Sequence, residues 1–189
     1  MAGKFSLRKF SDINLADHFF DSLKADYPGT DSSPGFITWF NKKAGEGRTA
    51  LIFDDEEGLG AFISLKAEIE EIKLQGGNLP IKQRTKISTL RIAERYRGQR
   101  LGEGAIGLVL WKWQQLGHEE IYVTVYPSHN DLIGQLEKFG FTLAGYNLDG
   151  ECVYMRSRKA VDYSDPYKPF PFIKPNFEKA GYLLINDYY

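Results

Sequence analysis

Cysteine is nearly absent from this chain, since Cys152 is the only one among its 189 residues. A lone cysteine excludes an internal disulfide framework and is typical of proteins from a reducing compartment. Cys152 falls in a predicted strand without a histidine partner in the sequence pattern. We therefore expect it to be a core residue rather than a nucleophile.

Long apolar runs and a large net charge are also missing. No stretch approaches the ~20 apolar residues of a membrane-spanning helix, and the N-terminus lacks the apolar core of a signal peptide. The net charge of -1 gives no overall attraction to nucleic acid or to a membrane surface. No cluster has metal-ligand spacing, so no metal is expected. These absences predict a soluble, cytoplasmic protein that contacts no membrane and for which nucleic acid is not the expected partner.

The chain can bury one hydrophobic core but lacks the length for two full-sized domains, since 42% of its residues are apolar. We expect one domain over residues 1–158. Residues 159–189 differ in composition, because they hold half of the eight prolines among many aromatic residues. A segment so rich in aromatic residues is rarely free in water. We expect this arm to pack on its own domain, to join two chains as a homodimer, or to begin a further domain.

The periodicity of the apolar residues predicts alternating α and β elements. Asp12 and Ser128 are the expected caps of the first and last helices. The strand, turn, helix and strand over residues 85–126 form one crossover unit with parallel strands, which predicts an α/β (α+β) fold. Strands are expected at residues 4–10, 49–53, 59–74, 85–93, 121–126, 141–146 and 151–156, and helices at 12–25, 34–45, 102–116 and 128–139.

The turn at residues 92–104 is the most informative segment, because it joins a predicted apolar strand to a predicted helix. Gly98, Gly102 and Gly104 allow a ligand to approach closely and allow positive φ, and the first amides of the helix attract anions. No Lys-Ser or Lys-Thr pair follows the glycines, and the spacing is not G-x-G-x-x-G, which excludes the better known phosphate loops. The turn indicates an anion site, although similar turns occur in α/β proteins that bind no ligand.

Residues around this turn resemble the GNAT (general-control-related N-acetyltransferase) acyltransferase superfamily. The segment Leu90-Arg91-Ile92-Ala93-Glu94-Arg95-Tyr96-Arg97-Gly98 is similar to the strand that leads into the family's acyl-CoA loop. Arg97-Gly98-Gln99-Arg100-Leu101-Gly102 matches the pattern Arg/Gln-x-x-Gly-x-Gly/Ala, except that Arg100 stands where the first glycine usually sits. Asn130, followed by Glu137-Lys138-Phe139-Gly140-Phe141, resembles the last helix and its Gly-Phe corner. The likeness covers residues 4–157 and implies the GNAT fold, a mixed sheet of about seven strands with a splayed pair.

The resemblance implies that acetyl-CoA is the co-substrate and that its pyrophosphate lies on the amides of the turn, with Arg97 and Arg100 as charge partners. In the family the splayed strands leave backbone groups exposed, and the pantetheine arm bonds to them like an extra strand. A shifted register, Gln99-x-x-Gly102-x-Gly104, satisfies the pattern fully and remains an alternative. The implied cofactor-binding residues are Leu90, Ile92, Arg97, Gly98, Gln99, Arg100, Leu101, Gly102, Glu103, Gly104 and Asn130.

Many members of the family place a tyrosine acid on the last helix, but Leu136 occupies that position here. Three explanations remain open: another tyrosine acts as the acid, the thiolate leaves without an acid, or the protein binds acyl-CoA without catalysis. Tyr126 and Tyr146 are the nearest substitutes by topology, although each is also a normal packing residue. Glu68 is the candidate that would attract and deprotonate a cationic amine, although exposed strand carboxylates are usually only solvated.

The sequence therefore predicts a GNAT-type N-acetyltransferase that acetylates a primary amine of a small molecule or peptide by direct attack in a ternary complex. A non-catalytic acyl-CoA-binding or interaction module is the first alternative. An RNA-directed acetyltransferase is the second, because Lys82, Arg84 and Lys86 add basic charge before the turn. The simpler reading of these three residues is an ordinary solvated face.

Overall fold

The computed structural model describes residues 4–30, 34–96 and 99–158. The chain forms two compact units, Met1–Ser64 with Thr89–Leu101 and Leu65–Ser88 with Gly102–Tyr189. The predicted arm at 159–189 lies outside the described residues, so the expected boundary after residue 158 stays a prediction. Within the described part of the chain, no helix has the length and apolar character needed to cross a membrane.

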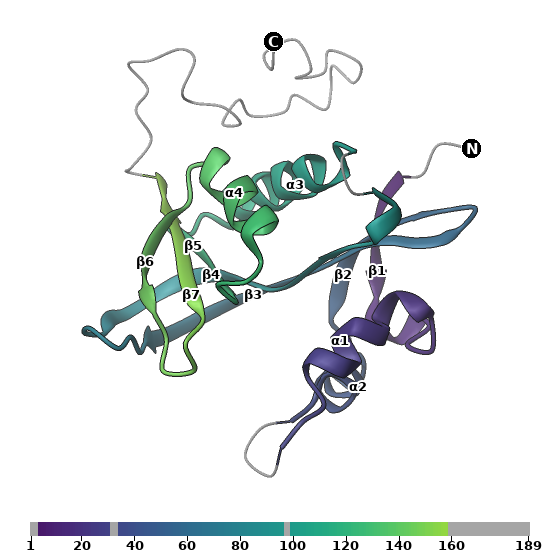
Figure 1. Ribbon diagram of the computed structural model, residues 1–189, viewed down its shortest axis with the longest axis horizontal. Coiled ribbons are helices and arrows are strands. Elements are labelled where there is room, and N and C mark those ends of the chain that lie inside the picture. The colour runs from purple at the N-terminus through teal and green to yellow at the C-terminus, as the bar shows by residue number, and fades with distance from the viewer. Residues whose placement is uncertain (1–3, 31–33, 97–98, 159–189) are drawn as a thin grey trace. The chain divides into compact units, whose positions relative to one another are not determined.

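Seven strands form one mixed sheet in the order β1-β2-β3-β4-β5-β7-β6 (Figure 1). Strands β4 and β5 run parallel, whereas the pairs β1–β2, β2–β3, β5–β7 and β6–β7 are antiparallel. The predicted α/β fold, its seven-stranded sheet and its single crossover are therefore confirmed. The elements are β1 (Lys4–Lys9), α1 (Asp21–Asp26), α2 (Phe36–Gly45), β2 (Thr49–Asp55), β3 (Gly58–Ile72), β4 (Leu79–Ile92), α3 (Leu101–Leu116), β5 (Glu120–Val125), α4 (Asn130–Lys138), β6 (Thr142–Tyr146) and β7 (Cys152–Ser157).

Aromatic side chains form the core of the first unit. Phe10, Phe20, Phe40 and Phe62 are almost fully buried. Their ring centroids lie between 4.9 Å and 6.1 Å apart, mostly in tilted or edge-to-face pairs. Such distances are favourable for aromatic rings. The core therefore ties α2, β3 and the segment before α1 together.

The helix predicted at residues 12–25 is wrong. The chain instead forms two 3₁₀ turns, Phe10–Asp12 and His18–Phe20, before the short helix α1. The side chains of Asn14 and Asp17 accept hydrogen bonds from backbone amides two residues further on, at 3.0 and 2.8 Å. Short polar side chains compete with the helix for these amides. Asp17, rather than Asp12, is therefore the capping residue.

The second unit is built on α3, which packs its apolar side against the sheet. Val109, Leu110 and Trp113 are buried, as are Ile121 and Val123 of β5. α4 begins at Asn130, and its N-cap residue, His129, makes no side-chain capping bond, so the predicted cap at residue 128 is wrong. Cys152 is buried and free, as expected for a core residue.

Candidate functional site

The first part of the predicted anion turn, up to Tyr96, is fixed by contacts inside the first unit. Tyr96 donates its hydroxyl hydrogen to the carboxylate of Asp55, and its ring lies edge-on to Phe53 at 5.4 Å. Arg95 donates to the same carboxylate at 3.0 Å and to the carbonyl of Gly58 at 3.0 Å. The chain therefore enters the turn from a 3₁₀ helix, Glu94–Tyr96, that is held against the tip of the β2–β3 hairpin.

The turn ends where α3 begins at Leu101. Arg97 and Gly98 lie outside the described residues, so their predicted roles stay predictions. No described residue other than glycine has a positive φ, so Arg100 fits its position without the left-handed conformation that favours glycine. Gly102 and Gly104 are also absent from the glycines with positive φ. The expectation that these two glycines supply positive φ is therefore wrong, since they are ordinary residues of the first helical turn.

Gly102 makes a close contact with α4, and its backbone angles are ones that any residue can adopt. A Cβ at Gly102 would lie 2.7 Å from Oε1 and 3.2 Å from Nε2 of Gln135. A Cβ at Gly104 would meet nothing within 4 Å. The first turn of α3 therefore presents bare backbone at Gly102, with the carboxamide of Gln135 directly against it. Gln135 was not among the residues expected from the sequence, because neither motif includes it.

The parallel pairing of β4 with β5 is short. The register runs from Arg84↔Glu120 to Ile87↔Val123. β5 continues past this point through Thr124 and Val125, which pair with β7 on the other side. The two strands are therefore paired only as far as Ile87 and Val123.

Glu68 is buried beside this ladder, where it contacts Tyr122 of β5, although the sequence predicted an exposed strand carboxylate. Only 7% of the residue is exposed. Tyr122 donates its hydroxyl hydrogen to Oε1 of Glu68, and Nζ of Lys66 lies 2.8 Å from Oε2. Tyr122 is the direct β5 partner of Lys86, one row before the last paired row. Nζ of Lys86 lies 5.4 Å from the centroid of the Tyr122 ring, which completes a polar cluster spanning three strands.

The charges in this cluster set its protonation. Burial raises the pKa of Glu68, but the hydrogen bonds from Lys66 and Tyr122 outweigh burial, so the net pKa lies below the ordinary value. Burial first, and then the hydrogen bond to Glu68, raise the pKa of Tyr122. The phenol therefore stays protonated and the carboxylate stays ionised at neutral pH. Such a pair binds a proton weakly at the carboxylate and releases one reluctantly from the phenol.

The two tyrosines predicted as acids lie in other settings. Tyr126 follows β5, is 37% exposed, and lies with its ring centroid 6.1 Å from that of His129. Tyr146 ends β6, is 44% exposed, and accepts a hydrogen bond from the amide of Gln75 at its carbonyl. Leu136 is fully buried, so the family's usual tyrosine position is a core position here.

A tyrosine that sequence reasoning missed lies beside Leu136. Tyr154 of β7 donates its hydroxyl hydrogen to Oε1 of Glu137 at 2.9 Å. Burial, followed by this bond, raises the pKa of Tyr154 to about 12. That value makes Tyr154 a weaker proton donor than an ordinary tyrosine. No periodicity in the sequence indicated that β7 would place a phenol under α4.

The basic residues that suggested an RNA surface are largely used inside the second unit. Arg84 is 2% exposed and donates to Glu120 at 2.7 Å and to the carbonyl of Pro80 at 2.9 Å. Lys82 lies within 2.8 Å of carboxylate oxygens of both Glu119 and Glu120. The reading of Arg84 as part of a solvated face is therefore wrong, because its guanidinium is a buried structural group.

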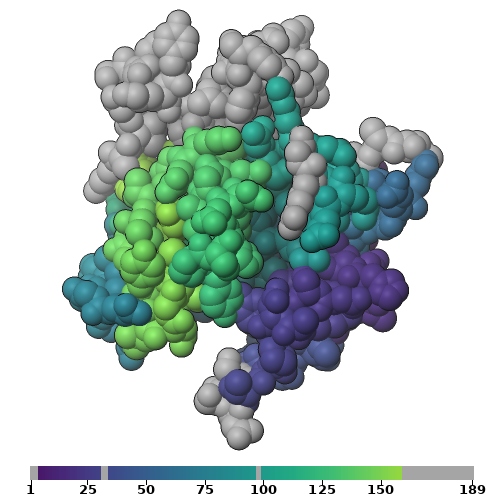
Figure 2. All heavy atoms as spheres, in the orientation of Figure 1, coloured from purple at the N-terminus to yellow at the C-terminus, as the bar shows by residue number. Residues whose placement is uncertain are grey.

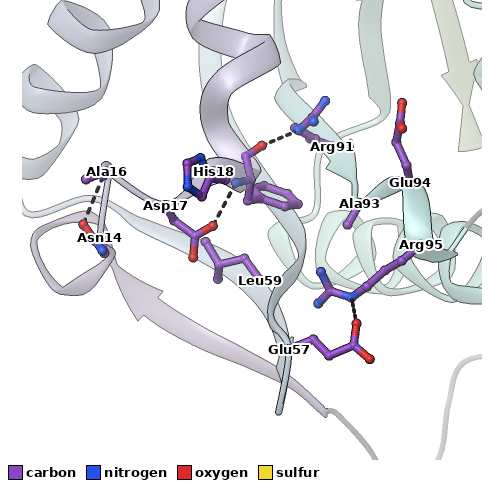
Figure 3. Close-up of a pocket in the computed structure, with 11 residues that line it drawn as sticks. Asn14, Ala16, Asp17, His18, Glu57, Leu59, Arg91, Ala93, Glu94 and Arg95 are labelled. Atoms are coloured by element: carbon purple, nitrogen blue, oxygen red, sulfur yellow. Dashed lines mark hydrogen bonds and ion pairs between the residues drawn. The ribbon is translucent and has the colours of Figure 1, made fainter.

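A pocket of about 590 Å³ lies within the first unit, at the end of β4 (Figure 3). Its walls come from residues 14–19, from the β2–β3 hairpin and from residues 91–95. Arg91 donates to the carbonyl of Phe19 at 2.7 Å, and Arg95 lies 3.5 Å from a carboxylate oxygen of Glu57. Carboxylates and guanidinium groups both line the pocket, so its charge favours neither a cation nor an anion. Among the described residues, no group of three His, Cys, Asp or Glu side chains could hold a metal ion.

The sequence and the fold both match known acetyltransferases. A family model described as the acetyltransferase (GNAT) family matches residues 16–141. Among curated proteins, none matches the chain significantly.

Solved structures with the same fold are distant in sequence. An N-acetyltransferase from Staphylococcus aureus Mu50 is 14% identical, with a TM-score of 0.57 over 83% of this chain and 99% of that one. Naa50 of Arabidopsis thaliana, in complex with the bisubstrate analogue CoA-Ac-MVNAL, is 21% identical, with a TM-score of 0.53 over 81% and 98%. The paia N-acetyltransferase of Thermoplasma acidophilum, in complex with coenzyme A, is 13% identical, with a TM-score of 0.55 over 83% and 99%.

Proposed function

Because the chain belongs to the acetyltransferase (GNAT) family, we propose that it moves an acetyl group from acetyl-CoA to a primary amine of a small molecule or peptide. The amine attacks the thioester directly in a ternary complex, without a covalent enzyme intermediate. The observation that carries the proposal is the start of α3 at Leu101, which falls within the family motif. The resemblance stated from the sequence is confirmed at the level of the family and its fold.

The residues at the start of α3 suit an anionic acyl donor. The first amides of a helix are free of intrahelical partners and carry partial positive charge. Gly102 adds no side chain of its own over these amides, and Arg100 stands at the turn with a backbone that needs no positive φ. Since the helix begins at Leu101, the unshifted register keeps residues 97–100 before the helix, whereas most of the shifted motif lies inside it, which favours the unshifted register. The pyrophosphate of coenzyme A is the anion we assign to this turn.

The short β4–β5 ladder supports the second part of the donor site. The paired rows of β4 and β5 end at Ile87 and Val123. A pantetheine arm, which carries two amide groups, can bond to such an edge as an added strand would. The assignments of Leu90, Ile92 and Asn130 rest on the family resemblance and stay part of this proposal.

The chemistry on the acceptor side demands little of the protein once the reactants are held in place. An amine with a pKa near ~10.4 must lose a proton before it attacks, and a departing thiolate with a pKa near ~8.5 needs only a weak acid or none. Positioning alone contributes much of the acceleration in such reactions. Glu68 is ionised at neutral pH, but Tyr122 and Lys66 already occupy its two oxygens, so the proposal does not need Glu68 as the base.

The first prediction is turnover with a primary amine. Thiol release from acetyl-CoA is measured over a panel of polyamines, aminoglycosides, lysine-containing peptides and peptides with free N-termini. The Naa50 complex with CoA-Ac-MVNAL is the reason to include peptide N-termini. We expect release to rise well above hydrolysis for at least one class. Tight binding of acetyl-CoA without turnover on any amine would contradict the enzyme proposal and favour a binding module.

A further inference from the structure

One side chain outside every motif lies against the proposed donor site. Gln135 belongs to α4, and its side chain contacts Gly102 in the first turn of α3, within the second unit. Its Cδ lies 3.3 Å from the position that a Cβ at Gly102 would occupy, and Oε1 lies only 2.7 Å from it. The carboxamide therefore fills the space of the side chain that Gly102 lacks. In the space-filling view the green surface of α4 adjoins the teal surface of α3 (Figure 2).

The direction of this contact places the carboxamide at the open end of the helix. In an α-helix every Cα–Cβ bond tilts toward the N-terminus, so a group at the Cβ position lies over the preceding turn. For Gly102, the second residue of α3, that direction leads to the free amides at the helix start. Nε2 of Gln135 lies 3.2 Å from that Cβ position, so the carboxamide supplies an N–H donor on the side of the helix that leads to those amides.

The carboxamide of Gln135 can form hydrogen bonds with a ligand. A glutamine side chain carries two N–H donors and one carbonyl acceptor. Within the described residues, no protein group forms a hydrogen bond with this side chain, whose residue is half-buried. A carboxamide bears no charge, so it can lie against a helix start without repelling an anion.

We propose that Gln135 is a further donor-binding residue, whose Nε2 donates a hydrogen bond to the pyrophosphate of coenzyme A at the start of α3. The inference rests on the proposed function, because it requires that the pyrophosphate lies on that turn. It assigns to α4 a role in recognising the phosphate end of the donor. The group that it recognises is a non-bridging oxygen of the pyrophosphate.

The test replaces Gln135 by Glu, which keeps the shape and reverses the hydrogen-bonding role of one atom. Affinities for coenzyme A and for 3′-dephospho-coenzyme A are measured by calorimetry. We expect Gln135→Glu to weaken both by about tenfold or more, since a carboxylate beside the pyrophosphate repels it and donates nothing. Gln135→Leu should weaken both as well, because it removes the hydrogen bond to a charged group. Gln115→Glu is the matched control, since Gln115 is exposed near the other end of α3 and the change in net charge is the same.

A readout of folding separates binding from structure. A carboxylate near a helix N-terminus stabilises that helix, so Gln135→Glu should unfold at the same temperature as wild type or higher while it binds the donor less well. If wild type binds no coenzyme A, the proposed function itself fails. If wild type binds and Gln135→Glu binds equally well, this inference is overturned. It is overturned too if only coenzyme A is weakened, because Gln135 would then contact the 3′-phosphate.

Discussion

Glu68 is an ionised group in a place where water cannot solvate it. A buried charge is expensive unless hydrogen bonds satisfy it, and replacing such a pair by apolar residues often leaves a protein equally stable. Tyr122 and Lys66 supply the bonds that Glu68 needs. Because an apolar cluster would serve the fold as well, a buried pair of titratable groups beside the short β4–β5 ladder is a candidate for function.

At this scale the second prediction concerns Glu68→Gln. The variant keeps the shape of the side chain but loses the charge that Lys66 and Tyr122 compensate, so we expect it to be less stable by about 2 kcal/mol at pH 7. The pKa of Glu68 is lowered in the folded state. Its contribution is therefore fully present above the unfolded pKa of about 4.3 and is lost as the pH falls through the folded value. Denaturant unfolding at several pH values should show the two proteins converging below about pH 4.

Glu70→Gln is the matched control, since Glu70 shares the same lysine but its side chain is 61% exposed. An exposed ion pair contributes little, so this variant should differ from wild type by less than about 0.5 kcal/mol. A Glu68→Gln protein as stable as wild type at pH 7, or a difference that persists unchanged at pH 3, would contradict the ionised assignment.

Single residues were the hardest part of the site to predict. The sequence predicts that the usual tyrosine acid is replaced by Leu136, and the structure shows that Leu136 is a buried core residue. The sequence could not show that Glu68 is buried, because alternation along a strand gives its face and not what covers that face. Tyr122 and Gln135 were not predicted for the same reason. Each is identified by a contact with a residue that is distant along the chain, Glu68 for Tyr122 and Gly102 for Gln135.

At the scale of elements, α3 carries the most informative local structure. The sequence predicted its start and end within one residue, because apolar periodicity, the glycine turn before it and Gly117 after it all agree. α1 and the start of α4 were placed less well. Side-chain hydrogen bonds decide those boundaries, and residue type alone does not show which side chain makes them.

The third prediction tests the start of α3 with a pair of glycine variants. Gly102→Val puts a branched side chain over the first amides and pushes the flexible end of Gln135 aside, so we expect acetyl-CoA affinity to fall by about tenfold or more. Gly107→Val is the control, because Gly107 lies further along the same helix and its Cβ would meet nothing within 4 Å. Calorimetry measures both affinities, and circular dichroism checks the helix content. Equal affinities for the two variants would show that the anion binds elsewhere.

At the scale of the whole molecule, neither compact unit is a continuous piece of chain. β3 contributes residues to both units, because the division falls between Ser64 and Leu65, and β4 does the same at Ser88 and Thr89. The sequence predicted the order of strands and the parallel crossover, since both follow from the alternation of elements. It did not predict this division, because no change of composition occurs inside a continuous strand.

The fourth prediction is a single unfolding transition. The strands β3 and β4 each contribute residues to both units, so unfolding of one unit alone would disrupt strands that belong to the other unit. Trp39 belongs to the first unit, and Trp111 and Trp113 belong to the second. Fluorescence of wild type and of Trp39→Phe, together with far-ultraviolet circular dichroism, should give coincident curves in urea. Separate midpoints for the two tryptophan signals would show that the units unfold independently.

The contact between Gly102 and Gln135 also predicts which residues occur together at these two positions in related proteins. A side chain at position 102 and a long side chain at position 135 compete for the same space. Among related sequences, the two positions should therefore vary together: alanine or serine at 102 should accompany a shorter residue at 135, and glutamine at 135 should accompany glycine at 102. Covariation of this pair would mark the proteins in which the last helix takes part in holding the acyl donor.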